Sequence, residues 1–473
     1  MWKGFRNIVL RVWRSSVFPL FLVLSLVGTR EADPTAALSP EANSFNAIPL
    51  IEAAKNQDWK EVRMLLEQDE DATVTSADGV TALHWASYWD NVETAELLIN
   101  SGADTNATND LGATPLWNAS LNGSEEMVRM LLRSGADPAI TLLSGETPVM
   151  TAARTGNAKV VDQLLIVGAD PNASGARGQT ALMWAAAQHH SAAVSVLLRH
   201  GADIHARSGT WSQVMAIPPH SDPANQQDVP YGNNTALMFA ARVGDLASAK
   251  LLIAAGARVN DSNARGTSAI VLAAHSGYGD LVEFLLNSSA DADAAGAGFS
   301  ALHLAIMRRN DAMARLLLEH GADPNARVTN WTASRRASND WHFHPALVGA
   351  TPFWLAARFS QPAVMRLLVE NGADPLFVHY ADYIGAAGTF GAVRRTEATT
   401  ALMAAVGMGG PRGMRAFVDP NHSEIEALTL EAVKLAVELG IDIRAVDQEG
   451  RTAADAARYE SVVEYLSTNG SRQ

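Results

Sequence analysis

The fold is decided by units such as TPLWNASLNGSEEMVRMLLRSGADP, residues 114–138. Thr114 is a good helix N-cap, because its hydroxyl accepts a hydrogen bond from a free backbone N–H, and Pro115 suits the first helical turn, where its missing N–H costs nothing. Apolar side chains then recur at helical spacing. After a turn at Gly123, a second helix ends in Leu131–Leu132, and Gly135 supplies the left-handed conformation that stops it. The stretch therefore predicts a pair of short helices.

This unit recurs along the chain. The Asp of its GAD triplet returns every 33 residues at Asp104, Asp137, Asp170 and Asp203. Further copies of GAD end at Asp323 and Asp374, and variants end at Arg258, Asp291 and Asp442. The Thr or Ser that opens each first helix stands at Thr81, Thr114, Thr147, Thr180, Thr235, Ser268, Ser300, Thr351, Thr400 and Thr452, and a degenerate first copy begins at Ile48. Self-similarity at a fixed period indicates a stacked repeat architecture.

A unit of this length with T-P-L-H-x-A, a double Leu and G-A-D-x-N resembles the ankyrin repeat. The resemblance covers roughly residues 48–466, some eleven units, and implies an all-α solenoid of stacked helix pairs with hairpin or finger loops. The first and last units lack key residues, as capping units do when their outer faces meet water. The resemblance also implies that His84 and His303 are structural and bond adjacent units.

Four inserts interrupt the repeat. Three lie in loops that join one helix pair to the next, at about residues 208–234, 328–350 and 377–399, where the family has a finger at one edge of the solenoid. The fourth, at about residues 407–427, lies between the two helices of the tenth unit and hence at the opposite edge. Since about 10 Å separates stacked helices, we expect roughly 30 Å between the first and second fingers. The second and third fingers should form one lobe.

The finger inserts are rich in Trp, Tyr and Arg, the side chains that dominate protein interfaces. Inserts on one face of a repeat array often form its binding face. We therefore predict that a partner protein contacts the finger residues Trp211, Trp331, Arg335, Arg336, Trp341, His342, Tyr380, Tyr383, Arg394 and Arg395. The concave groove is a second candidate surface, where the resemblance places Trp85, Trp184 and Phe239; for these rings the alternative is packing between repeats.

Other chemistries leave weaker signals. His342 and His344, with Asp340 beside them, are an alternative metal or small-ligand site to which His379 or Tyr380 would contribute, but no known ligand spacing is present. The Arg pairs of the second and third fingers are either solvated or clamps for a carboxylate. No nucleophile elbow, phosphate loop or zincin motif occurs. We therefore predict no catalytic residue, no metal and no cofactor, and a chain that is not an enzyme.

Composition limits the class of partner. The chain has 473 residues, of which 48% are hydrophobic, and a formal net charge of −14. This acidic balance disfavours nucleic acid as the main partner, because nucleic acid needs a basic face. The absence of Cys excludes disulfides and zinc–thiolate sites. The expected partner is a protein whose identity the sequence does not give.

The N-terminal sequence predicts that the protein is exported from the cytoplasm. Residues 1–29 carry four basic side chains and the apolar run 17–27, which is typical of a secretory signal, although an uncleaved membrane anchor is the alternative. We predict a linker at 30–43, the solenoid at 44–467 and a tail at 468–473. The protein would then be periplasmic in a bacterium and secreted otherwise, with a membrane tether only through residues 1–29.

Overall fold

The computed structural model describes residues 48–216, 226–332, 343–387, 391–411, 414, 416–418, 421 and 423–470. The predicted signal or anchor (1–29) and linker (30–43) lie outside the described residues, as do residues 471–473 of the predicted tail. Residues 48–473 form one compact unit of the chain, and the description below concerns that unit.

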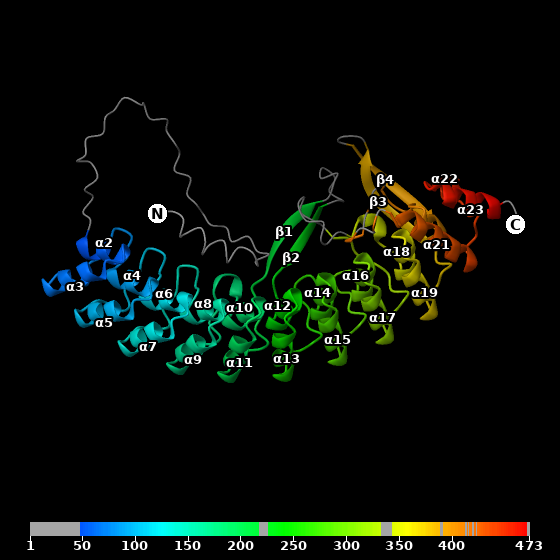
Figure 1. Cartoon of the computed structure of the whole chain (residues 1–473). Coiled ribbons are helices and arrows are strands. Elements are labelled where there is room, and N and C mark those ends of the chain that lie inside the picture. The colour runs from blue at the N-terminus through cyan, green and yellow to red at the C-terminus, as the bar shows by residue number, and fades with distance from the viewer. Residues whose placement is uncertain are drawn as a thin grey trace, which may run out of the picture. The chain divides into compact units, whose positions relative to one another are not determined.

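The unit consists of eleven helix pairs stacked in sequence order (Figure 1). The first helices of the pairs are α2 Pro49–Lys55, α4 Ala82–Tyr88, α6 Pro115–Asn122, α8 Pro148–Thr155, α10 Ala181–Ala187, α12 Ala236–Val243, α14 Ala269–Ser276, α16 Ala301–Met307, α18 Pro352–Arg358, α20 Ala401–Ala405 and α22 Ala453–Ala456. The second helices are α3 Trp59–Glu67, α5 Val92–Asn100, α7 Glu125–Arg133, α9 Ala158–Ile166, α11 Ser191–Arg199, α13 Leu246–Ala254, α15 Gly279–Asn287, α17 Asp311–Glu319, α19 Pro362–Glu370, α21 Ile425–Glu438 and α23 Glu460–Gly470. First helices contact first helices, and second helices contact second helices. The predicted all-α ankyrin solenoid is confirmed.

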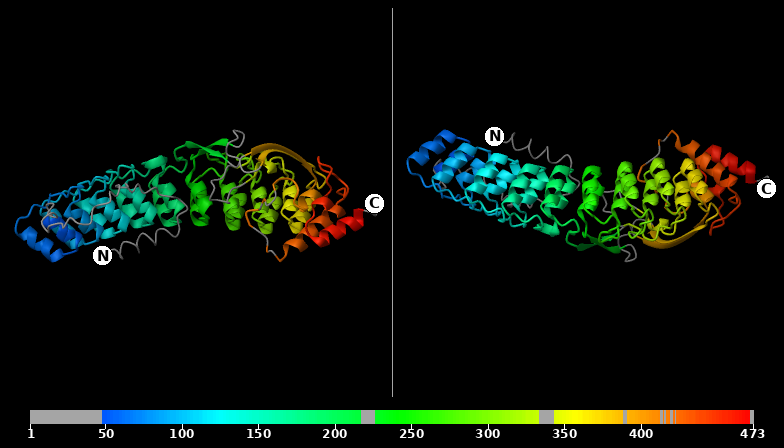
Figure 2. Two further views of the ribbon diagram at one scale, coloured as in Figure 1. Left: turned by 90° about the horizontal axis from the view of Figure 1, so that it is seen from above. Right: turned by 90° about the horizontal axis from the view of Figure 1, so that it is seen from below.

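Two antiparallel hairpins rise from the same edge of the stack (Figure 1). In the first finger β1 Trp211–Ala216 pairs with β2 Gln226–Tyr231, and in the third β3 His379–Ala387 pairs with β4 Gly391–Thr399. Short 3₁₀ helices lie at η1 Ala176–Gly178 and η3 Pro345–Leu347. The insert between α20 and α21 leaves from the other edge, as the two views of Figure 2 show.

Local chemistry starts and stops the helices as the sequence predicts. The side-chain oxygen of the N-cap accepts a hydrogen bond from the third helical residue at Thr81, Thr114, Thr147, Thr180, Thr235, Thr351, Thr400 and Thr452. The glycine after the second helix has a positive φ in each unit that carries it; at Gly102 φ is 93°. Nothing lies within 4 Å of a Cβ placed on Gly102, so backbone conformation alone selects glycine there.

Two histidines bind the loops that lead from their own unit to the next. The Nε2 of His84 donates to the carbonyl oxygen of Ala113 at 2.9 Å, and the Nε2 of His303 donates to that of Ala326 at 3.1 Å. Each ring accepts a backbone N–H of its own N-cap residue at Nδ1. Both imidazoles are buried, so the structural role that the resemblance implies is confirmed.

Candidate functional site

The first helices differ in how much of their surface is open. Each packs against two neighbouring first helices and its own second helix, so only the side opposite the second helix is left for solvent; we call this side the free face. It corresponds to the predicted concave groove. Trp85 and Tyr88 of α4, Asn118 of α6 and Trp184 of α10 are partly exposed, whereas Thr151 of α8, at the repeat position of Trp85, is buried. In α16 and α18, by contrast, all seven residues are buried, so their free face is covered.

Two inserts from opposite edges cover α16. The buried ring of Phe343, in the second finger, stacks on Phe299 at 4.6 Å and meets Phe417, in the fourth insert, edge-to-face at 5.9 Å. Phe299 lies just before α16, whereas the N–H of Phe417 donates to the carbonyl oxygen of Met307 at its end, at 2.8 Å. Phe417 also contacts His275 of α14 at 5.9 Å. The inserts therefore meet over the free face.

The third finger is attached to the same structure. The Tyr383 hydroxyl donates to Oε1 of Glu397 at 2.9 Å, and Oε2 of Glu397 accepts the N–H of Gly410 at 2.8 Å. Burial, reinforced by Glu397, raises the pKa of Tyr383. The Nε2 of the fully buried His379 donates to the carbonyl oxygen of Ala346 at 2.8 Å. We call the second finger, the third finger and the fourth insert together the insert cluster.

The expected gap between the first and second fingers is wrong. Trp331 of the second finger packs against Met215 and Val229, the buried residues of the β1–β2 hairpin. The reason is that residues at the start of the second finger run along the preceding loop, where the N–H of Thr329 donates to the carbonyl oxygen of Gly298 at 2.8 Å. The β1–β2 hairpin and Trp331 thus meet above the two short inter-repeat loops that lie between the first and second fingers in the stack.

Burial corrects two of the predicted partner-binding residues. Phe239 and Tyr383 are each only 5% exposed, so neither ring can supply much contact area to a partner. Phe239 belongs to the core between repeats, which was the alternative for that position. Tyr383 is held by Glu397.

The other predicted binding residues are distributed over separate surfaces. Tyr380 is 71% exposed and Trp211 39% exposed, and Arg395 is exposed as well. Arg394 forms an exposed ion pair with Asp382, so its guanidinium is not a free clamp. Four predicted residues lie outside the described part of the chain: Arg335, Arg336, Trp341 and His342.

The described histidines of the insert cluster use ring nitrogens for the fold. The Nδ1 of His344 accepts the N–H of Ala346 at 3.1 Å, and the Nε2 of His379 is bound to the carbonyl oxygen of the same residue. Burial lowers the pKa of His379. Within the described ranges, no group of three or more His, Asp or Glu residues is arranged to hold a metal ion.

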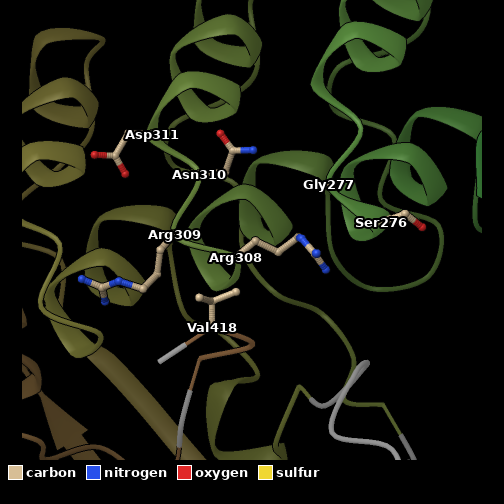
Figure 3. Close-up of a pocket in the computed structure, with 7 residues that line it drawn as sticks. All are labelled: Ser276, Gly277, Arg308, Arg309, Asn310, Asp311 and Val418. Carbon is tan, nitrogen blue, oxygen red and sulfur yellow. The ribbon is translucent and has the colours of Figure 1, made fainter. Parts of the chain in front are cut away.

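A hollow of about 530 Å³ lies at the turns that follow α14 and α16, where the fourth insert approaches (Figure 3). Figure 3 shows Arg308 and Arg309 extending in opposite directions. Arg308 donates to the carbonyl oxygen of His275, and Arg309 donates to those of Phe359 and Ser360. These arginines therefore join neighbouring repeat turns, and we assign the hollow to the packing of the fourth insert.

Sequence reasoning missed that only part of the free face is open. The available signal was composition: α16 reads ALHLAIM and is apolar apart from His303, with Leu304 and Met307 at the positions where α4 has Trp85 and Tyr88. A helix with no polar stripe needs a cover on every side.

These features define a class, a helical repeat solenoid that presents an aromatic free face. The family profile described as ankyrin repeats (3 copies) matches residues 22–109, 50–141, 116–208 and 219–328, and the single ankyrin repeat profile matches residues 348–380. The chain belongs to the ankyrin-repeat family. Ankyrin repeats are protein-interaction modules that are generally non-catalytic. Membership of the family therefore indicates that the chain is a protein-interaction scaffold.

Relatives share only part of their length with this chain. A putative ankyrin repeat-containing protein of Treponema pallidum (strain Nichols) is 33% identical over 134 residues, which cover 28% of this chain and 39% of that protein. Transient receptor potential cation channel subfamily V member 1 of Oryctolagus cuniculus is 31% identical over 123 residues, covering 24% and 14%. The chain thus spans less than half of each of these relatives.

A solved ankyrin repeat domain also matches. The human ASB11 ankyrin repeat domain is 26% identical, with a TM-score of 0.42, and the match covers 51% of this chain and 97% of that chain. In the part of the chain that the structure describes, no helix is long and apolar enough to span a membrane.

Proposed function

We propose that this protein is a non-catalytic scaffold that works outside the cytoplasm and binds a protein partner through the free face of α4–α10, with the exposed finger side chains contributing. One observation carries the proposal: the free face carries partly exposed tryptophan rings in α4 and α10, whereas it is covered in α16 and α18. Large rings left open to solvent beside each other mark interaction sites.

The rings at the start of this surface are held in place. Trp85 and Tyr88 contact edge-to-face at 5.8 Å, and Tyr88 and Trp89 at 4.9 Å. The Nε1 of Trp89 donates to the carbonyl oxygen of Lys55 at 3.3 Å, and the side-chain amide of Asn122 donates to that of Tyr88 at 2.7 Å. A partner therefore meets an aromatic surface that loses little conformational freedom on binding.

Trp184 is a second partly exposed tryptophan on the free face, three repeats further along the stack. The guanidinium of Arg154 lies 5.9 Å from the centre of the Trp184 ring and pairs with Glu146 at 2.9 Å. Between these aromatic rings, Asn118 donates to the carbonyl oxygen of His84 at 3.2 Å. The surface thus combines large rings with fixed polar groups, which is typical of the centre of a protein interface.

The double variant Trp85→Ala/Trp184→Ala is expected to lose at least tenfold in affinity for the partner, since buried tryptophans at interface centres contribute about 2 kcal/mol or more each. The partner is first captured with the wild-type chain and identified, and dissociation constants are then measured with purified proteins. Phe239→Leu is the matched control, because Phe239 occupies the same repeat position but is buried. Unchanged affinity of the double variant, with its helix content intact, would contradict the proposal.

The proposed compartment rests on residues 1–29, where basic side chains precede a short apolar run. We expect the protein in the periplasm if the source is bacterial and in the medium otherwise, with a mature N-terminus between residues 28 and 38. Mass spectrometry of the intact exported protein measures this directly. An intact N-terminus in the membrane fraction would indicate the tethered alternative, and recovery from the cytosol alone would overturn export.

A further inference from the structure

Four side chains from three consecutive loops stack beside the first finger. The guanidinium carbon of Arg177 lies 4.7 Å from the centre of the Trp211 ring, Trp211 stacks on Tyr231 at 5.5 Å with an 11° angle, and the guanidinium carbon of Arg265 lies 5.4 Å from the centre of Tyr231. Trp211 and Tyr231 are opposite each other in the β1–β2 hairpin. The order is therefore cation, ring, ring, cation.

Backbone contacts fix the three loops relative to each other. The N–H of Gly209 donates to the carbonyl oxygen of Arg177 at 2.6 Å, and the N–H of Ala264 donates to that of Gly232 at 3.1 Å. A Cβ on Gly232, where φ is 87°, would lie 1.9 Å from the carbonyl oxygen of Gly209. Glycine at position 232 thus lets the two chains at the base of the β1–β2 hairpin approach closely, next to the paired residues Trp211 and Tyr231.

The arginines here lack acidic partners. Among the described residues, Arg177, Arg265 and the nearby Arg242 of α12 form no ion pair and no side-chain hydrogen bond. Burial, followed by the positive charge of Arg265, lowers the pKa of Arg242, and burial lowers that of Arg265. Arg207, in the same region, does pair with Asp261 at 2.7 Å.

This lack of partners is unusual in a chain with 50 acidic and 36 basic side chains. A half-buried guanidinium without a counter-charge destabilises the fold, because it has lost hydration without gaining an ion pair. Guanidiniums bind carboxylates through two parallel hydrogen bonds, so an external carboxylate would supply the missing partner. The net charge of −14 opposes a long polyanion, but at 0.15 M salt it is screened beyond about 8 Å.

We propose that Arg177, Trp211, Tyr231, Arg242 and Arg265, the arginine ladder, bind an acidic segment of the partner protein, with its carboxylates on the guanidiniums and its chain along the two rings. This inference rests on the proposed function and names the chemistry of the partner. The site lies beside the free face of α10, so one partner can reach both surfaces.

The unpaired charge gives a test that needs no partner. Arg242→Met is expected to raise the midpoint of thermal unfolding by about 2 °C, because it removes an uncompensated charge and keeps an unbranched side chain. Arg154→Met, beside Trp184 on the free face, is the matched variant. It should lower the midpoint of thermal unfolding, because Arg154 is paired with Glu146. If Arg242→Met lowered the midpoint of thermal unfolding as much as Arg154→Met does, the charge of Arg242 would already have a partner in the fold, and the inference would be overturned.

The binding test uses fluorescein-labelled peptides of five Glu–Gly repeats and of five Gln–Gly repeats, measured by anisotropy with the full chain. We expect the Glu peptide alone to bind at 50 mM NaCl, and Arg242→Met/Arg265→Met to raise its dissociation constant at least tenfold. Arg366→Met is the control and should change nothing, because Arg366 pairs with Glu431 elsewhere on the stack. Equal binding of both peptides, equal binding by the double arginine variant, or tighter binding of a ten-nucleotide DNA strand would overturn the inference.

Failure of the inference can be separated from failure of the scaffold function. If the Glu peptide does not bind but Trp85→Ala/Trp184→Ala still loses the captured partner, the acidic segment is excluded and the scaffold function stands. If Trp85→Ala/Trp184→Ala keeps the partner, the proposed free-face interaction fails whatever the peptide does.

Discussion

Phe343→Ala is expected to destabilise the insert cluster by about 3 to 5 kcal/mol, the range for truncating a fully buried Phe. Phe343 has no exposed surface and connects Phe299 to Phe417, so its loss leaves a cavity and separates the two inserts that meet over α16. Hydrogen exchange measures this effect locally. Peptides that cover α16 and residues 416–418 should exchange faster.

The effect of Phe343→Ala should remain local, because each repeat contacts only its neighbours. Exchange in α2–α9 is therefore expected to stay unchanged and serves as an internal control. Phe343→Leu keeps most of the apolar volume and should cost less than about 1.5 kcal/mol. Unchanged protection of residues 416–418 in Phe343→Ala would mean that Phe417 is held independently of the second finger.

Acid is expected to weaken the middle of the stack through His303. Burial lowers the pKa of His303 from 6.5 to about 4. Between these values the unfolded chain binds a proton that the folded chain excludes, so the stabilisation is complete above pH 6.5 and falls as the pH drops toward 4. At 1.36 kcal/mol per pKa unit, the loss by pH 4 is about 3 kcal/mol. Burial lowers the pKa of His84 and His379 in the same direction.

The experiment follows hydrogen exchange of α16 peptides from pH 7 to pH 4.5, corrected for the intrinsic exchange rate at each pH. His303→Asn cannot titrate in this range, so its α16 should start with lower protection and lose less of it on acidification. Asp323, whose negative charge raises the pKa of His303, is retained in both proteins. An equal loss of protection in the variant and the wild type would assign the acid sensitivity to other groups.

Most of the fold could be predicted because its determinants are local. Thr81 and its equivalents cap helices a few residues away, and Gly102 stops a helix through its own φ. The contacts of His84 and His303 also follow from the repeat, since each ring reaches the loop that leads from its own unit to the next. The hairpins of the first and third fingers occur where the repeat register breaks.

The candidate surfaces were predicted less well, because they depend on residues from distant parts of the chain. Trp85 and Trp184 are partly exposed whereas Phe239, at the same repeat position, is buried, and no local pattern separates the three. Arg177 and Arg265 were not singled out, because each is an ordinary loop residue until the hairpin places Trp211 and Tyr231 between them.

The sequence by itself thus determined that the chain is a stack of helix pairs, since caps, apolar spacing and glycines act within one unit and repeat with it. Only the tertiary structure decided which part of the stack is open to a partner. Phe343 and Phe417 come from inserts at opposite edges, and they meet over α16 because its apolar free face has to be covered. That contact closes the later repeats, whereas Trp85 of α4 and Trp184 of α10 stay partly exposed on the free face.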